Sequence, residues 1–386
     1  MNHVEKIAAH LQQSQNKMVD FLQKLACSES PSTEPQSQQE VFQILTEKLE
    51  GIGFRVEILP SKTTGGNLLA VPKDFAEGQP YQMLIGHCDT VWPIDTIKEM
   101  PVEVKDNILY GPGTYDMKGG LTQMLFALET LRDLQLDLDV APMVFINSDE
   151  EIGSEESTEL IANYAKNADR VFVLEPSLGA EGKLKTSRKG VGHFRVKVKG
   201  KAAHAGLDPQ AGVSAIVELS MIVQKLFAMN DYERGISVNV GMIEGGVRPN
   251  VIAPESSAVI DVRVPTPEDA KMVEEEILNL QPSREDVIVE VEGRIGRAPM
   301  EQTKRNQVLW MRAQQAAQVL GIEIEQGCAG GGSDGNTTSL YTATLDGLGC
   351  VGDGAHATHE HIRIDKLWER TALLSLLLLD APTNKN

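Results

Sequence analysis

Residues 110–120 read Tyr-Gly-Pro-Gly-Thr-Tyr-Asp-Met-Lys-Gly-Gly, and the only carboxylate in this stretch is Asp116. Leucine and methionine recur at helical spacing directly after it, which predicts a buried helix. A single acid on a glycine-rich turn at a helix entrance suits a metal ligand better than a solvated charge. Gly111 and Gly113 also fit a dinucleotide fingerprint, but Asp116 stands at its third glycine and would repel a pyrophosphate. The stretch therefore predicts a metal site.

Three short apolar segments near this motif have the character of interior strands, and each leads into histidine or acidic side chains. The segments are residues 81–86, 140–146 and 171–174. The side chains that follow them are His87, Asp89, Asp149, Glu150, Glu151 and Glu175. This pattern is typical of an α/β sheet whose site lies at the carboxyl ends of its strands.

The composition changes near residue 190. Residues 190–200 alternate between polar and apolar side chains, as in a strand with one exposed face. The segments that follow complete a β-α-β-β-α-β order, the ferredoxin-like arrangement. We therefore predict an α/β fold with a discontinuous catalytic domain, residues 1–189 and 298–386, that has a central mixed sheet flanked by helices. Residues 190–297 are predicted to form an inserted α+β domain.

The bulk composition limits the partners and the compartment. A net charge of −19 over 386 residues argues against a nucleic-acid partner and against an anionic membrane surface. The four cysteines have no paired spacing, which indicates a reducing compartment without a disulfide framework. Residues 1–26 lack the apolar core of a signal peptide, and residues 373–379 are too short an apolar run to span a membrane. We expect a cytoplasmic protein.

The acidic and histidine side chains at the strand ends, with His356 late in the chain, combine imidazole and carboxylate without thiolate. This donor set suits Zn²⁺ or another divalent ion such as Co²⁺ or Mn²⁺. So many acids in one cleft would repel one another unless cations neutralised them. Two metal ions bridged by one carboxylate would do so, and Asp116 is the natural bridge.

Six motifs occur in a fixed order along nearly the whole chain. They are His87-x-Asp89, Gly113-x-x-Asp116-Met117-Lys118-Gly119-Gly120, Asp149-Glu150-Glu151-x-Gly153-Ser154, Glu175-Pro176, Gly200-x-x-x-His204-Ala205-Gly206 and Gly354-Ala355-His356. In these motifs the chain resembles the M20 family of di-zinc peptidases and deacylases, and within it the glutamate carboxypeptidases. The resemblance implies two Zn²⁺ per chain, a zinc-peptidase catalytic domain, and an inserted domain that serves as lid and forms a homodimer.

The resemblance also implies the metal ligands. His87 and Glu175 would hold one zinc ion, Glu151 and His356 would hold the other, and Asp116 would bridge both.

Three catalytic roles follow from the same resemblance. Asp89 would orient the imidazole of His87 through its second nitrogen. Glu150 would be the general base, which takes a proton from water and delivers it to the leaving amine. His204 would come from a partner subunit and stabilise the developing oxyanion.

The substrate-binding residues rest on weaker similarity. Asn250, Gly330 and Gly331 resemble substrate-binding positions of the family. Arg297 resembles the arginine that receives the free carboxylate of the substrate in a bidentate pair, and Arg263 is a rival for that task.

The expected reaction is hydrolysis of an amide next to a free carboxylate, with release of C-terminal glutamate or a related amino acid from a small peptide. The alternative is an N-acyl amino acid deacylase of the acetylornithine deacetylase or succinyl-diaminopimelate desuccinylase type, since these enzymes share the metal motifs. Glu175 disfavours an aminopeptidase, because several di- and tripeptidases of the family carry aspartate at this position. A third interpretation is a metal-binding scaffold without catalysis. The intact Glu150 and the full ligand set argue against it.

Overall fold

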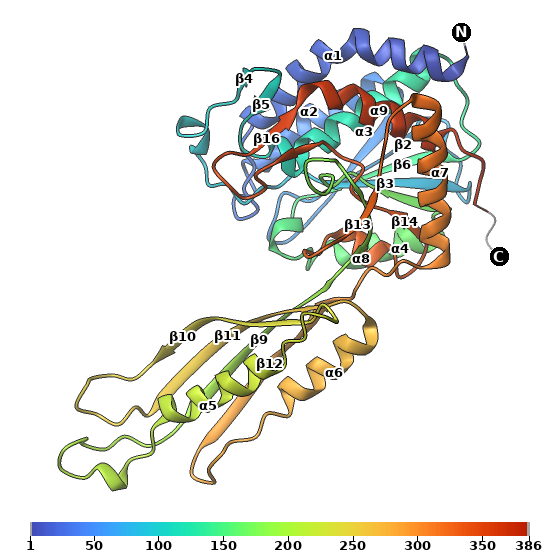
Figure 1. The fold of residues 1–386 in the computed structure, drawn as a ribbon. Coiled ribbons are helices and arrows are strands. Elements are labelled where there is room, and N and C mark those ends of the chain that lie inside the picture. The colour runs from blue at the N-terminus through green and yellow to red at the C-terminus, as the bar shows by residue number, and fades with distance from the viewer. Residues whose placement is uncertain (1, 384–386) are drawn as a thin grey trace. The chain divides into compact units, whose positions relative to one another are not determined.

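The computed structural model describes residues 2–383, and the chain divides into two compact units (Figure 1). The first unit comprises Met1–Thr186, Gln302–Cys328 and Ser333–Asn386, and the second comprises Ser187–Glu301 with Ala329–Gly332. The second unit is thus slightly larger than the segment 190–297 that the sequence pattern marks as inserted.

A six-stranded mixed sheet forms the centre of the first unit, as predicted. In spatial order its strands are β1 (Phe54–Leu59), β2 (Asn67–Pro72), β6 (Ala141–Asn147), β3 (Tyr81–His87), β7 (Arg170–Val173) and β14 (Ala343–Leu345). The last four run parallel to one another, whereas β1 and β2 pair antiparallel. Because β6 and β7 flank β3, the carboxyl ends of these three strands lie side by side.

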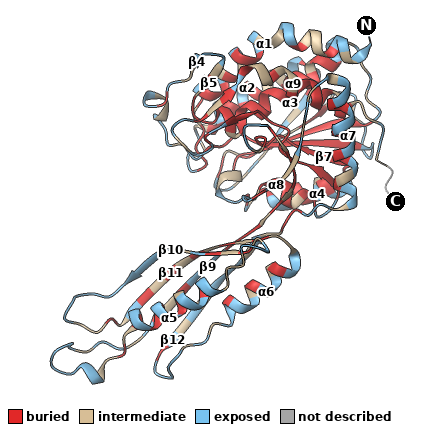
Figure 2. Ribbon diagram, in the orientation of Figure 1, coloured by how far each residue is buried: buried red, intermediate tan, exposed pale blue. Residues whose placement is uncertain are grey.

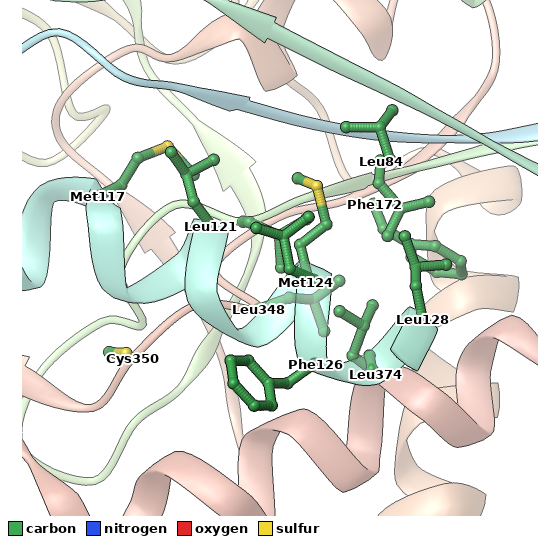
Figure 3. Close-up of a cluster of buried hydrophobic side chains, with 14 of the residues drawn as sticks. Leu84, Met117, Leu121, Met124, Phe126, Leu128, Phe172, Leu348, Cys350 and Leu374 are labelled. Carbon is green, nitrogen blue, oxygen red and sulfur yellow. The ribbon is translucent and has the colours of Figure 1, made fainter. Parts of the chain in front are cut away.

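Helices cover both faces of this sheet, and the buried residues, red in Figure 2, are concentrated where the helices meet the sheet. One face packs against α1 (His3–Cys27), α2 (Gln38–Gly51), α3 (Gly119–Asp133), α7 (Lys304–Leu320) and α9 (Ile364–Leu378). Figure 3 shows part of this core, where Leu84 of β3 and Phe172 of β7 meet Met124 and Leu128 of α3.

Alternate residues of β3 point to the opposite face, where Met83 and Ile85 pack against α4 (Thr158–Asn167). The short helix α8 (Asp334–Thr338) contacts α4 as well. This helix begins shortly after Gly330 and Gly331 in the chain. None of the helices in residues 2–383 combines the length and apolar character needed to cross a membrane.

Several short strands were not predicted. Two ladders contain them: β4 (Glu103–Lys105), β5 (Ile108–Tyr110), β16 (His361–Arg363) and β15 (Gly352–Asp353) form one, and β8 (Leu184–Arg188) and β13 (Gln326–Ala329) form the other. The first ladder matters for the site, since the segment that carries His356 lies between β15 and β16. The strand β16 also pairs with β5, which lies just ahead of Asp116 in the chain.

The second unit has the predicted ferredoxin-like order. Its elements are β9 (Gly190–Lys199), α5 (Ala215–Ala228), β10 (Ser237–Gly245), β11 (Glu255–Val264), α6 (Pro267–Leu278) and β12 (Ile288–Arg297). The strands form an antiparallel sheet in the order β10-β11-β9-β12. Phe194, Val196 and Val198 of β9 face the helices and form the core of this unit.

Candidate metal centre and active site

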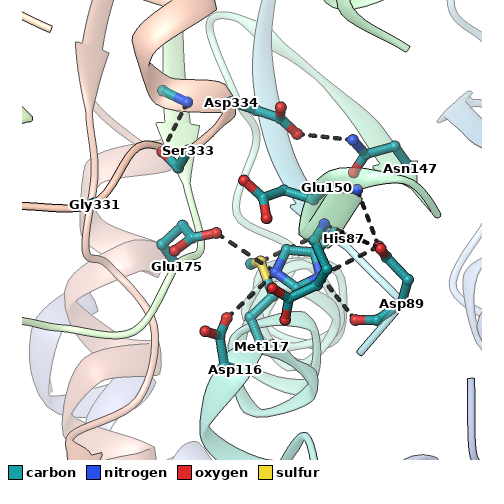
Figure 4. Close-up of polar contacts among 12 residues, drawn as sticks. His87, Asp89, Asp116, Met117, Asn147, Glu150, Glu175, Gly331, Ser333 and Asp334 are labelled. Atoms are coloured by element: carbon teal, nitrogen blue, oxygen red, sulfur yellow. Dashed lines mark hydrogen bonds and ion pairs between the residues drawn. The ribbon is translucent and has the colours of Figure 1, made fainter. Parts of the chain in front are cut away.

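The parallel strands of the first unit bring three predicted site residues together. His87 is the last residue of β3, Glu150 begins the short 3₁₀ segment Glu150–Ile152 after β6, and Glu175 follows β7. Each offers one ligand atom, and these atoms lie within 4.8 Å of one another. Nε2 of His87 is 3.5 Å from Oε1 of Glu175 (Figure 4). Neighbouring strand ends therefore converge as the sequence predicts.

Asp116 lies between two histidines that are far apart in the chain. Its Oδ1 is 3.3 Å from Nε2 of His87, and its Oδ2 is 3.5 Å from Nε2 of His356. Nε2 of His356 also lies 3.0 Å from Oε2 of Glu151. His87, Asp116 and Glu151 form a second group whose ligand atoms lie within 4.8 Å. One carboxylate thus faces both halves of the cluster, with a different oxygen toward each.

The backbone around Asp116 is irregular. Gly113 has a φ of 71°, a left-handed conformation that glycine adopts without strain. Asp116 and Met117 have non-helical dihedral angles, and the peptide bond between them is cis. The regular helix α3 begins only at Gly119. The predicted turn therefore aims the Asp116 side chain before the helix starts.

Asp89 is fully buried and organises the groups around it. Nδ1 of His87 is 2.9 Å from the backbone oxygen of Asp89 and 3.4 Å from its Oδ1, which fixes the imidazole ring with Nε2 toward the cluster. The carboxylate also accepts hydrogen bonds from the backbone N–H groups of Glu150 (3.3 Å) and Glu151 (3.1 Å). The sequence predicted the first contact but not the second, through which Asp89 positions both glutamates.

The electrostatics of the cluster favour cations. Hydrogen bonds to Asp116 and Glu151 raise the pKa of His356 to about 10. Burial would lower the pKa of His87, but its hydrogen bonds to Asp116 and to other carboxylates raise the pKa well above its usual value. Burial raises the pKa of Glu151 to about 7. The donor set of imidazoles and carboxylates without thiolate therefore fits divalent metal ions, whose charge would replace these protons.

His204 belongs to the second unit, where it is exposed. Its Nδ1 accepts hydrogen bonds from the backbone N–H groups of Gly206 (3.2 Å) and Leu207 (3.1 Å). A neutral imidazole that accepts at Nδ1 carries its proton at Nε2, so His204 presents an N–H donor. The backbone oxygen of Asn250 accepts from Ala205 at 3.0 Å. Two predicted site residues, His204 and Asn250, are therefore neighbours.

The two candidate arginines also lie in the second unit, in different surroundings. Arg263 of β11 donates two hydrogen bonds to Asp261 of its own strand, at 2.8 and 2.9 Å. Arg297 is half-buried at the end of β12. The pairing with Asp261 engages Arg263 within its own sheet.

Gly330 and Gly331 are exposed and belong to the segment Ala329–Gly332 of the second unit. The backbone oxygen of Gly331 accepts a hydrogen bond from Nη1 of the buried Arg188 at 3.1 Å. This arginine fixes the glycine segment and was not predicted. Nothing in its sequence neighbourhood distinguishes it from a surface cation.

Comparisons with known proteins agree with these motifs. The model of Peptidase family M20/M25/M40 matches residues 83–380. Carboxypeptidase G2 of Pseudomonas sp. (strain RS-16) is 28% identical over 383 residues, which cover 96% of this chain and 91% of that protein. Acetylornithine deacetylase of Edwardsiella ictaluri (strain 93-146) is 31% identical over 248 residues, only 59% of this chain and 61% of that protein.

The fold has a counterpart among solved structures. The M20 family metallo-carboxypeptidase Sso-CP2 from Sulfolobus solfataricus superposes with a TM-score of 0.74 at 18% identity, over 94% of this chain and 98% of that chain. The family match spans most of the chain and includes His87, Asp116 and His356. The chain therefore belongs to peptidase family M20/M25/M40, and it is a hydrolase related to carboxypeptidase G2 and to the acetylornithine deacetylases.

Proposed function

We propose that this protein is a di-zinc hydrolase that cleaves an amide bond next to a free carboxylate and releases C-terminal glutamate or a related amino acid. The observation that carries this proposal is the position of Asp116, whose two oxygens face His87 and His356 separately. A carboxylate placed in this way suits a bridge between two metal ions. The relationship to carboxypeptidase G2 over nearly the full length supports the substrate class.

Five side chains would hold the two ions. His87 and Glu175 would bind one ion, Glu151 and His356 the other, and Asp116 both. Bound divalent ions would polarise the scissile carbonyl and bring the pKa of water close to neutrality.

Glu150 would transfer the proton. Its backbone N–H is held by Asp89, and its carboxylate belongs to the group formed with His87 and Glu175. It would take a proton from the attacking water and deliver it to the nitrogen of the leaving amine, a role typically worth about 10²–10⁴-fold in rate. The Nε2–H of His204 would donate to the developing oxyanion, and one such donor is worth about 10²–10³-fold.

Specificity would come from the free carboxylate of the substrate. We assign its recognition to Arg297, because a guanidinium can pair with a carboxylate through two parallel hydrogen bonds. Asn250 and the Gly330–Gly331 segment would contribute further contacts to the substrate.

A second candidate function has its own support. The 31% identity to an acetylornithine deacetylase favours an N-acyl amino acid deacylase with the same metal centre. The succinyl-diaminopimelate desuccinylase of Azoarcus sp. (strain BH72), at 27% identity, belongs to the same group of candidates. The two candidate functions differ in the acyl group that the pocket accepts.

We further propose a homodimer formed by the second unit. Several large apolar side chains of this unit are exposed: Ile216, Val217, Met221 and Phe227 on α5, and Met242 and Ile243 on β10. The strand β10 is also an edge strand, which offers unpaired backbone groups. Apolar side chains gathered near an open sheet edge are typical of an association surface.

The four cysteines are free, which agrees with the proposal of a cytoplasmic location.

Amino-acid release by the zinc-loaded protein from a small panel tests the reaction. The panel holds N-acyl glutamates, a peptide ending in glutamate, N-acetylornithine, N-succinyl-diaminopimelate and a plain dipeptide. Selective release of glutamate is expected. Preference for one acylated amino acid would move the assignment to the deacylases, and no release from any substrate would contradict both candidates.

A further inference from the structure

Glu360 is a buried carboxylate with an unusually complete set of donors. Its side chain is 1% exposed. Oε1 accepts the backbone N–H groups of Tyr115 and Asp116, both at 3.0 Å. Oε2 accepts the backbone N–H of Gly113 and the indole N–H of Trp92, both at 2.8 Å. Three of the four donors belong to the irregular turn that presents Asp116.

The backbone of Glu360 is fixed at the same time to the segment that carries His356. Glu360 lies between β15 and β16, and its backbone N–H donates to the oxygen of Ala357 at 2.9 Å. Its own backbone oxygen accepts from Gly111 at 3.2 Å. Gly354 packs so closely that a Cβ there would come within 2.8 Å of the Glu360 nitrogen. One residue therefore ties the Asp116 turn to the His356 segment.

From this geometry we infer that Glu360 is a positioning residue that holds the carboxylate of Asp116 between His87 and His356. It contacts the backbone of Asp116 and acts through that residue. The inference rests on the proposed function, because it concerns the bridging position between the two metal ions. Substitution of a residue that orients a metal ligand by a hydrogen bond typically lowers metal affinity by about 10–100-fold.

The four hydrogen bonds make both oxygens necessary. Glutamine has almost the same shape as glutamate, but its NH₂ group can only donate. Whichever way the amide of Glu360→Gln turns, the NH₂ group faces two N–H donors. Trp92→Phe removes the indole donor, so the NH₂ group of the double variant faces only one N–H donor, that of Gly113, while its carbonyl stays on Tyr115 and Asp116. The inference therefore predicts that the second substitution repairs part of the damage of the first.

Calorimetric titration of the metal-depleted full-length protein with Zn²⁺ tests this, together with kcat and KM on the substrate found in the panel. Glu360→Gln is expected to weaken the binding of at least one of the two ions about 10–100-fold and to lower kcat more than it changes KM. Trp92→Phe alone is expected to weaken zinc binding less than Glu360→Gln does. The double variant is expected to bind zinc more tightly than Glu360→Gln alone.

Glu218→Gln is the matched control. Glu218 is a carboxylate of the second unit, 2% exposed, that accepts hydrogen bonds from the backbone and hydroxyl of Ser283. The control variant is expected to bind zinc as the wild type does, even where its unfolding transition shifts. If Glu360→Gln does not fold, a folded double variant that binds two ions still supports the inference, and a double variant that remains unfolded overturns it.

Two other results would overturn the inference, and they differ in what else they contradict. Glu360→Gln that binds two zinc ions as tightly as the wild type would overturn the role of Glu360 alone. Fewer than two zinc ions in the wild-type protein would overturn it together with the proposed di-zinc function.

Discussion

The two oxygens of Asp116 make the strongest case for a two-metal centre. Each lies within 3.5 Å of a different imidazole nitrogen, and the two histidines come from positions 87 and 356. A carboxylate that only satisfied hydrogen bonds would not need separate imidazoles on its two oxygens. Asp89 and Glu360 fix two of these side chains through hydrogen bonds, Asp89 to the imidazole of His87 and Glu360 to the backbone N–H of Asp116.

Removal of the Glu150 carboxylate separates catalysis from metal binding. Glu150→Ala is expected to keep two bound metal ions but to lose about 10²–10⁴-fold in kcat, since the proton-transfer group is gone. Glu155→Ala, at an exposed glutamate of the same loop, is the matched control and should turn over normally. Metal content and steady-state rates measured side by side decide the matter. Near-normal turnover of Glu150→Ala would contradict the mechanism.

The two arginines can be told apart by the same kinetics. Arg297→Ala is expected to reduce kcat/KM by at least about 10- to 100-fold, because even one hydrogen bond to a charged group contributes about 1.5–3 kcal/mol. The loss should appear mainly in KM. Arg263→Ala should stay within a few-fold of the wild type, since Arg263 is already paired with Asp261. A larger loss for Arg263→Ala than for Arg297→Ala would reverse the assignment.

The sequence could predict which side chains lie close together where each of them follows a buried strand. His87, Glu150 and Glu175 could be placed together because parallel strands end at one edge of a sheet. The role of Glu360 could not be predicted, since its hydrogen bonds to the Asp116 turn join segments that are far apart in the chain. The nearness of His204 to Asn250 depends on a contact between distant segments, which periodicity does not report.

Among the secondary-structure elements, the apolar strands predicted at residues 81–86, 140–146 and 171–174 lie close to the observed bounds of β3, β6 and β7. The strands β4, β5, β15 and β16 were not, because two or three residues are too few to show a period. The strand β12 extends to Arg297, the last residue of the predicted inserted domain. Gly293 and Gly296 read as turn residues there, although the sheet accommodates both.

The contact between α3 and the end of β7 sets the position of Glu175. A Cβ at Gly120 would lie 1.9 Å from the backbone oxygen of Leu174, the residue before Glu175. Gly120→Ala is therefore expected to destabilise the fold by about 1–3 kcal/mol and to weaken zinc binding, because the backbone beside this proposed ligand must shift. Denaturant unfolding of the metal-free protein and a zinc titration measure the two effects.

Gly51→Ala is the control for that substitution. Gly51 is the last residue of α2, and nothing lies within 4 Å of a Cβ added there. Alanine in place of glycine in a helix stabilises by about 0.5–1 kcal/mol, so this variant should be as stable as the wild type or more so. Equal behaviour of the two variants would show that the contact of Gly120 with Leu174 is unimportant.

For the whole molecule, the proposal of a homodimer links assembly to activity. Ile243 is 59% exposed on the edge strand β10, and Ile243→Lys places a charge on that edge. The wild type is expected to sediment as a dimer of 42.1 kDa chains, and the variant as a monomer with reduced turnover if His204 acts across the interface. Val319→Lys, at a residue of α7 that is 61% exposed in the first unit, should leave the dimer intact. A monomeric wild type would contradict the proposal.

The most direct test of the two-metal centre is anomalous diffraction at the zinc edge from crystals of the zinc-loaded protein. Two peaks are predicted on either side of the Asp116 carboxylate, roughly 3.5–4 Å apart, as in other two-metal sites. One should be bound by His87 and Glu175, and the other by Glu151 and His356. A single peak, or none in contact with Asp116, would contradict the account.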